Sequence, residues 1–227
     1  MNSSSLLLSS VAATLLLVTP LSAQRPDAAA KQASHRRMVQ ELAAIAERAK
    51  TDHKYHGDQN AKRLWAELAA AGEQAPWKLR LDAALEHLRL GATRDGIAIL
   101  EHGLEAMQKG SIPEDKDGRN ALRFYLGMAW LRLAETDNCC ARNTPESCIL
   151  PLRGGALHTA TEGSTKAIPY FLAVMQDTPP DDYWHLGARW LVNLAHMTLD
   201  SWPDGVPEAH RIPASAMASS VPFPKLP

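Results

Sequence analysis

The side chains best suited to chemistry lie in one segment, residues 138–158, which holds all three cysteines and a histidine. In an oxidising compartment, two of the three cysteines are expected to pair. Cys139 or Cys140 could pair with Cys148, whereas a bond between the two adjacent cysteines would need a strained ring. One thiol is left over, and the sequence favours a buried, apolar role for it over pairing between molecules.

The same side chains offer two further chemistries. The three cysteines and His158 could surround zinc or copper, but they lack the C-x2-C spacing, and a disulfide would consume two ligands. Cys140 and His158 could form a nucleophile and its base, but no third residue that would orient the histidine is apparent. We therefore predict no bound metal, no cofactor and no catalytic residue.

Two other patterns have a chemical and a plain interpretation. The backbone N–H groups of Arg153-Gly154-Gly155 could bind an anion, although a turn that returns the loop to the helices is the simpler role. His53 and His56 are spaced to share a metal ion, but a solvated helix end is the more common role of such a pair. We expect the plain interpretation in both places.

The cysteine segment interrupts a helical hairpin. Residues 120–134 and 167–179 have the pattern of the two helices of one tetratricopeptide repeat, with small Gly127 and Ala167 where the helices cross. In that repeat about four residues join the helices, whereas here the connection runs from 135 to 166. The sequence therefore predicts an insertion in the turn, which costs little because loop-closure entropy grows slowly with length.

A second, weaker hairpin precedes it, from Trp77 to Gln108. Apolar residues recur at helical spacing in both halves. Gly96 and Gly103 lower the helix propensity of the second half, so we interpret them as positions of close helix crossing. Two ordinary antiparallel helices are the alternative.

Further helices flank these hairpins. An amphipathic helix carries Met38, Leu42, Ile45 and Ala49 on one face, and a shorter helix ends at Gly72. A last helix is expected to begin at Thr178-Pro-Pro-Asp181 and to stop before Pro203. The sequence thus predicts an all-α fold, a short TPR-like α-solenoid over 27–201 with the insertion at about 135–166, and a proline-rich extended tail over 202–227.

The N-terminus has the features of a signal peptide over residues 1–23. An apolar stretch from Leu6 to Val18 is followed by Leu21-Ser22-Ala23, which places a small residue before a cut at Gln24. The stretch is too short for a comfortable membrane span. We therefore predict export to the periplasm or the extracellular space, with an uncleaved anchor as the alternative.

Composition is that of an ordinary globular chain, with 45% hydrophobic and 22% charged residues. A net charge of −1 gives no bulk attraction to nucleic acid or to membranes. The chain also lacks the glycine-rich nucleotide-binding motifs and the H-E-x-x-H motif. No enzyme class is indicated.

Several stretches share a pattern with a known family. They are Asn138-Cys139, Glu146–Gly155 with His158, Ala188–Ala195 with Met197–Leu199, Pro203–Pro207 and Pro222–Lys225. Together they resemble the TPR-bearing N-terminal region of secreted FG-GAP-repeat proteins that end in an ASPIC/UnbV module, loosely called cartilage-acidic-protein-like. The resemblance implies a disulfide between Cys139 and Cys148, with Cys140 as the remaining thiol.

In that family a calcium-binding β-propeller follows the helical region. This chain has no D-x-D-x-D-G loop, so the resemblance transfers no calcium site to any residue here. It implies a split or truncated gene, or a helical module that works beside a separately encoded propeller.

The repeat register predicts a groove with an apolar floor and a basic edge. The residues expected to contact a partner are Lys78, Arg89, Phe124, Arg132, Arg189 and His196. Such a groove would suit a protein or peptide with an acidic or C-terminal carboxylate. We therefore expect a secreted scaffold without catalysis of its own. The alternatives are a core role for these residues, a metal- or thiol-dependent function of the inserted loop, and a structural remnant of a larger propeller protein.

Overall fold

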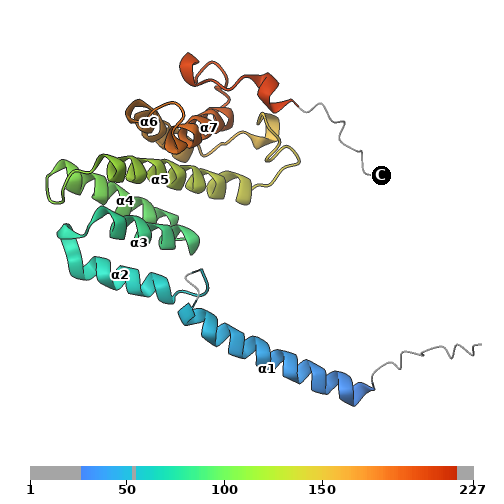
Figure 1. The fold of residues 1–227 in the computed structure, drawn as a ribbon. Coiled ribbons are helices and arrows are strands. Elements are labelled where there is room, and N and C mark those ends of the chain that lie inside the picture. Colours follow the sequence, from blue (N-terminus) through green and yellow to red (C-terminus); the bar gives the residue numbers. More distant parts are fainter. Residues whose placement is uncertain (1–26, 53–54, 219–227) are drawn as a thin grey trace, which may run out of the picture. The chain divides into compact units, whose positions relative to one another are not determined.

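The computed structural model describes residues 27–52 and 55–218, without the side chains of residues 50–52. The predicted signal peptide, His53 and residues 219–227 therefore lie outside the described residues. All regular elements in the described ranges are helical, which confirms the all-α fold class (Figure 1). The main helices are α1 (Ala28–Asp52), α2 (Gln59–Ala71), α3 (Trp77–Arg89), α4 (Thr93–Gln108), α5 (Lys116–Glu135), α6 (Glu162–Asp177) and α7 (Tyr183–Thr198).

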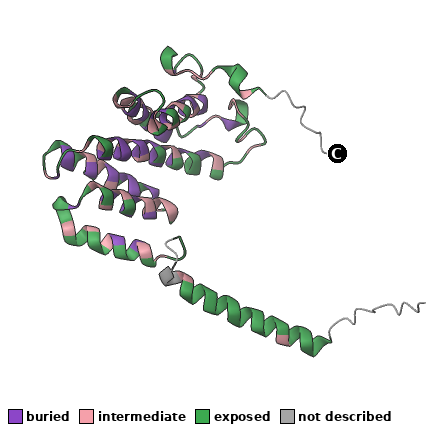
Figure 2. Ribbon diagram, viewed as in Figure 1, coloured by how far each residue is buried: buried purple, intermediate pink, exposed green. Residues whose placement is uncertain are grey.

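The chain divides into two units, residues 1–48 and residues 49–227. Most of α1 belongs to the first unit, and nearly all of its described side chains are exposed (Figure 2). In the second unit each helix packs against its neighbours in sequence, and α5 also contacts α3 and α7. This pairing is that of stacked antiparallel hairpins, whereas the TPR register itself stays a prediction.

The α2–α3 connection is held by a buried arginine. Gly72 ends α2, as the sequence predicted, with φ of 54°, a conformation that favours glycine. Arg80 of α3 donates hydrogen bonds to the backbone carbonyl oxygens of Gly72, Glu73 and Ala75 at 3.1 Å. The guanidinium thereby satisfies carbonyl groups that the end of a helix leaves without partners.

The start of α5 is fixed by its N-cap. The Asp115 carboxylate accepts hydrogen bonds from the backbone N–H groups of Asp117 and Gly118, at 3.0 and 3.1 Å. Its other oxygen accepts from Trp77 Nε1 at 2.9 Å, which joins the first turns of α3 and α5. These hydrogen bonds lower the pKa of the Asp115 carboxyl group.

Two glycines allow α5 and α6 to approach closely. A Cβ atom on Gly127 would lie 2.7 Å from Phe171 Cε1, and one on Gly163 would lie 2.5 Å from the carbonyl oxygen of Trp130. The predicted role of Gly127 at a helix crossing agrees with this geometry. Gly163 was not identified from the sequence, because it lies inside the stretch assigned to the insertion, whose last five residues, 162–166, begin α6 instead.

The start of α7 differs from the expectation. Asp182 is the N-cap, accepting from Trp184 N at 2.7 Å, whereas Thr178 ends α6 and donates from Oγ1 to the Val174 carbonyl oxygen at 2.7 Å. The reason is the pair Pro179-Pro180. A residue before proline is disfavoured in a helix, so Thr178 closes the preceding helix, and the chain needs a further turn before α7 begins.

The segment after α7 is not the extended tail that the sequence predicted. Residues 202–212, which we term the C-terminal strap, pack against α7, and Val206 within them is buried. Asn193 of α7 holds the strap, since its Oδ1 accepts from Trp202 Nε1 and Ile212 N, both at 3.0 Å, and its Nδ2 donates to the His210 carbonyl oxygen at 2.9 Å. The prolines restrict this segment to one short 3-10 helix, η4 (Glu208–His210), but they do not prevent its packing.

Candidate functional site

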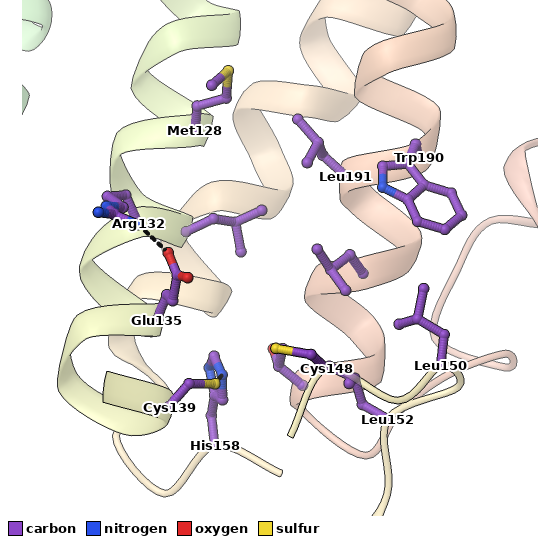
Figure 3. A pocket seen from close by; sticks show the side chains of 13 residues that line it. Met128, Arg132, Glu135, Cys139, Cys148, Leu150, Leu152, His158, Trp190 and Leu191 are labelled. Atoms are coloured by element: carbon purple, nitrogen blue, oxygen red, sulfur yellow. Dashed lines mark hydrogen bonds and ion pairs between the residues drawn. The ribbon is translucent and has the colours of Figure 1, made fainter. Parts of the chain in front are cut away.

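An apolar pocket of about 430 Å³ lies between α5, α7 and the insertion. In Figure 3, Met128 lies on the α5 side, Trp190 and Leu191 lie on the α7 side, and Leu150 and Leu152 come from the insertion. α5 and α7 are separated in sequence by the insertion and α6, so the pocket is a product of the hairpin stacking. Its walls are mainly leucine, with methionine and tryptophan.

One end of the pocket contains a thiol and an imidazole in contact. Cys139 Sγ lies 3.4 Å from His158 Nε2, and His158 Nδ1 lies 3.1 Å from Ser164 Oγ. Thr198 Oγ1 lies 2.7 Å from the same serine oxygen. A hydrogen-bonded series therefore runs from η2 (Thr136–Cys140), the π-helical turn that follows α5, through the insertion to α6 and α7.

The protonation states of this pair are those of neutral groups. Burial raises the pKa of the Cys139 thiol, and the nearby Cys148 and Glu135 act in the same direction. Burial also lowers the pKa of His158, against a smaller opposite effect of Glu135. A nucleophilic cysteine needs the reverse, a thiolate stabilised by a cationic neighbour, so this environment favours a hydrogen-bonded neutral pair.

Cys139, and not Cys140, is the cysteine that contacts His158. Cys140, which the sequence paired with His158 and predicted to be buried, is exposed. In this turn Asn138 takes the buried position and Cys139 faces the histidine. Ser164, six residues after His158, contacts the imidazole ring at Nδ1 and orients it. This residue was not identified from the sequence.

The predicted disulfide between Cys139 and Cys148 is not formed in this structure. All three cysteines are free thiols. Cys139 and Cys148 nevertheless line the same pocket (Figure 3), so the pairing stays a prediction that needs a chemical test.

Asn138 anchors the insertion. Its Nδ2 donates to the carbonyl oxygens of Ala134 and Ala160, at 2.8 and 3.0 Å, and its Oδ1 accepts from the backbone N–H groups of Thr159 and Ala160. The backbone N–H of His158 donates to the Thr198 carbonyl oxygen at 2.9 Å. The returning end of the insertion is thus fixed to both α5 and α7, which gives the pocket a defined wall.

Of the six residues predicted to contact a partner, four make contacts within the chain. Phe124 is buried in the core and packs edge-on against Trp184. Arg189 donates to the carbonyl oxygens of His210 and Arg211 in the strap. His196 Nδ1 lies 2.8 Å from Ser201 Oγ.

Arg89 is the fourth. Its guanidinium contacts Glu86 Oε2 at 2.6 Å and donates to the carbonyl oxygens of Tyr55 and Gly57. It therefore fixes the loop before α2.

Lys78 and Arg132 remain exposed. The Lys78 ammonium lies 5.4 Å from the centre of the Trp77 ring, on α3, and Lys78 does not line the pocket. Arg132 does line it, with its guanidinium 2.6 Å from Glu135 Oε2 (Figure 3). The predicted basic edge is thus reduced to one arginine that is paired with a glutamate.

The glycine pair of the insertion lies in a turn. Gly154 has φ of 58°, which agrees with the turn predicted at Arg153-Gly154-Gly155. Within residues 27–52 and 55–218, no three histidine, cysteine or acidic residues are grouped so as to hold a metal ion. No helix in the described part of the chain is long and apolar enough to span a membrane.

Comparison with known proteins gives no match: no family model, no curated protein and no solved structure is similar to this chain.

Proposed function

We propose that this chain is an exported, helical-repeat scaffold that binds a segment of a partner protein and has no catalysis of its own. The observation that carries the proposal is the apolar pocket between α5, α7 and the insertion. Its volume of about 430 Å³ falls within the roughly 300–1,000 Å³ of ligand sites in proteins. It is therefore large enough for one or two apolar side chains.

The pocket presents apolar surface that the fold itself does not cover. Met128 and Trp190 are 37% and 40% exposed although both are large and apolar. Burying one leucine- or phenylalanine-sized side chain of a partner would contribute roughly 1.5–3 kcal/mol. A tryptophan beside a pocket is also a typical centre of a binding hot spot.

The charges at the rim favour an apolar anchor over a purely acidic peptide. Arg132 already contacts Glu135 at 2.6 Å, so this edge carries no net charge. A partner carboxylate next to the anchor would have to compete with Glu135 for the guanidinium. The acidic preference that the sequence suggested is therefore a secondary feature of the proposal.

A peptide-display selection on the purified chain tests the proposal. We expect enriched peptides to share aliphatic or aromatic residues, and Trp190→Ala and Met128→Ala each to weaken their binding about tenfold. Leu90→Ala is the matched control, since Leu90 is 42% exposed but lies outside the pocket. The proposal fails if no peptide is enriched, or if the pocket variants and the control bind the selected peptides equally.

A thiol-dependent function of the insertion is the second candidate. It is favoured by the contact between Cys139 and His158 and by the presence of Cys148 in the same pocket. It requires Cys139 to react as a thiolate near neutral pH, which the raised pKa of that thiol opposes. Alkylation with iodoacetamide at pH 7 decides this, with exposed Cys140 as the internal reference: slower reaction of Cys139 supports the scaffold, and faster reaction supports thiol chemistry.

The resemblance to the secreted FG-GAP-repeat proteins belongs to the same proposal. In that setting the helical unit would act beside a propeller encoded separately or in an adjacent part of the gene. Sequencing the DNA beyond the codon for Pro227 tests this relation, since FG-GAP repeats there would make the chain the helical part of a larger protein and a structural remnant the better description.

A further inference from the structure

α1 carries an apolar stripe that its own unit does not cover. Met38, Leu42 and Ile45 are 51%, 56% and 49% exposed, and their spacing places them on one face of the helix. Most of the stability of a helix in a protein comes from the packing of its apolar face. A partner for the stripe would therefore stabilise the helix as well as cover it.

The stripe has the register of a short coiled coil. Met38 and Ile45 occupy one core position of a heptad, and Leu42 occupies the other. Beside them, Val39 and Ala46 form one flank of the stripe, whereas Glu41 and Arg48 form the other. The residues that flank a coiled-coil core determine which helices pair and in which direction.

The charges of this flank are self-complementary in one direction only. In an antiparallel pair of α1 helices, Leu42 packs against Ile45 of the second copy, and Glu41 lies opposite Arg48 of the second copy. Two such ion pairs form in each dimer. In a parallel pair, the charged flank of one helix lies beside the apolar flank of the other, and Glu41 faces Ala46.

We propose that α1 is a self-association surface through which two copies of this chain pair by antiparallel α1 helices. The interface is isologous, because the same patch on each copy contacts its equivalent. It covers about two heptads and buries less than the roughly 1,000 Å² of a stable interface, so the association is weak and depends on concentration. The pocket between α5 and α7 takes no part in it.

Sedimentation equilibrium of the full chain, from about 5 to about 500 µM, tests the proposal in the concentration range of weak interfaces. We expect a monomer–dimer equilibrium that Leu42→Asp abolishes. The thermal melt of the second unit should not change in this variant, since Leu42 lies outside that unit. Trp190→Ala should leave the dimerisation constant unchanged, which separates this proposal from the proposed partner binding.

A charge-exchange series tests the direction of pairing. Glu41→Arg and Arg48→Glu should each raise the dimer dissociation constant about tenfold, because two attractive pairs become repulsive, and the double variant should restore it. The two residues are two helical turns apart, roughly 10 Å along the axis, so restoration cannot come from a contact within one helix. A chain that stays monomeric at the highest concentration, or a double variant that is not restored, overturns the proposal.

Discussion

Gly127 should be hard to replace, because α6 packs directly against it. A Cβ atom at this position would lie 2.7, 2.8 and 3.0 Å from three carbon atoms of the Phe171 ring, and Phe171 is fully buried. The ring cannot move without displacing its own neighbours, so added atoms overpack the contact, which costs typically 1–3 kcal/mol. Replacing glycine in a helix returns about 0.8–1.0 kcal/mol of helix propensity. Gly127→Leu adds four carbon atoms, so we take the upper end of the overpacking range, about 3 kcal/mol. With about 1 kcal/mol of helix propensity returned, we expect a net loss of about 2 kcal/mol.

Gly155→Ala is the matched control. A Cβ atom on Gly155 would also meet an atom at 2.7 Å, but this atom is Oε2 of Glu146, the end of an exposed and flexible side chain. The other close atoms are Oγ1 and Cβ of Thr144, at 2.9 and 3.1 Å, in the surface loop that Gly155 itself contacts. We expect a change within about 0.5 kcal/mol, as at other surface positions. Urea unfolding followed by circular dichroism measures both free energies. Equal stability of Gly127→Leu and the parent would show that α5 and α6 do not cross at Gly127.

The remaining predictions concern charge, pH and processing. Arg89→Ala should lower the free energy of unfolding by about 1–3 kcal/mol, because the buried Glu86 carboxylate loses its cationic partner and keeps the hydrogen bond from Asn60 Nδ2. Arg132→Ala, at an exposed pair, should cost less than about 1 kcal/mol. Equal melting temperatures of the two variants would contradict the role of Arg89. Stability should fall as the pH drops from 7.5 to 5.5, since a histidine whose pKa is lowered by folding binds a proton more readily in the unfolded chain, below about pH 6.5. Urea unfolding that is equally or more stable at pH 5.5 would refute this effect of the histidines with lowered pKa, His87, His158, His196 and His210. Mass spectrometry of the exported protein should find Gln24 at the N-terminus, and an intact Met1 on cytoplasmic protein would contradict the export prediction. Thiol titration of the denatured protein should find one free thiol before reduction and three after it. Three thiols before reduction would contradict the disulfide.

The helices of the second unit were predictable because their signals are local. Apolar spacing, Gly72 at a helix end and small residues at a crossing are read within a few residues of the position they describe. The long connection between α5 and α6 is also visible in the sequence, where it separates two apolar helical patterns. Helix starts were less certain, and Asp182 replaced Thr178 as a cap because two prolines lie between them.

The candidate site was less predictable because its determinants are not local. Arg89 and Arg189 were assigned to a groove from their positions in the repeat, but both donate to backbone carbonyl oxygens of distant segments, 32 and 22 residues away. Every residue has a carbonyl oxygen, so the sequence does not mark which one an arginine will bind. A partly buried arginine that holds a loop therefore cannot be distinguished from an exposed arginine by the residues next to it in the sequence. The pocket has the same origin, since its walls come from α5, α7 and the insertion.

Two buried asparagines show what a better sequence rule would use. Asn138 and Asn193 each donate to the carbonyl oxygen four residues earlier, at 2.8 Å, and each donates to a second carbonyl oxygen in a returning segment. Each also accepts two N–H groups at Oδ1, so the whole hydrogen-bonding capacity of the amide is used. An amide buried on an apolar helix face would otherwise cost about 1–3 kcal/mol. At these two positions the asparagine marks a helix face to which another part of the chain returns, namely the insertion wall and the C-terminal strap. Burial alone does not give this information, since Oδ1 of buried Asn120 in α5 has no such partner.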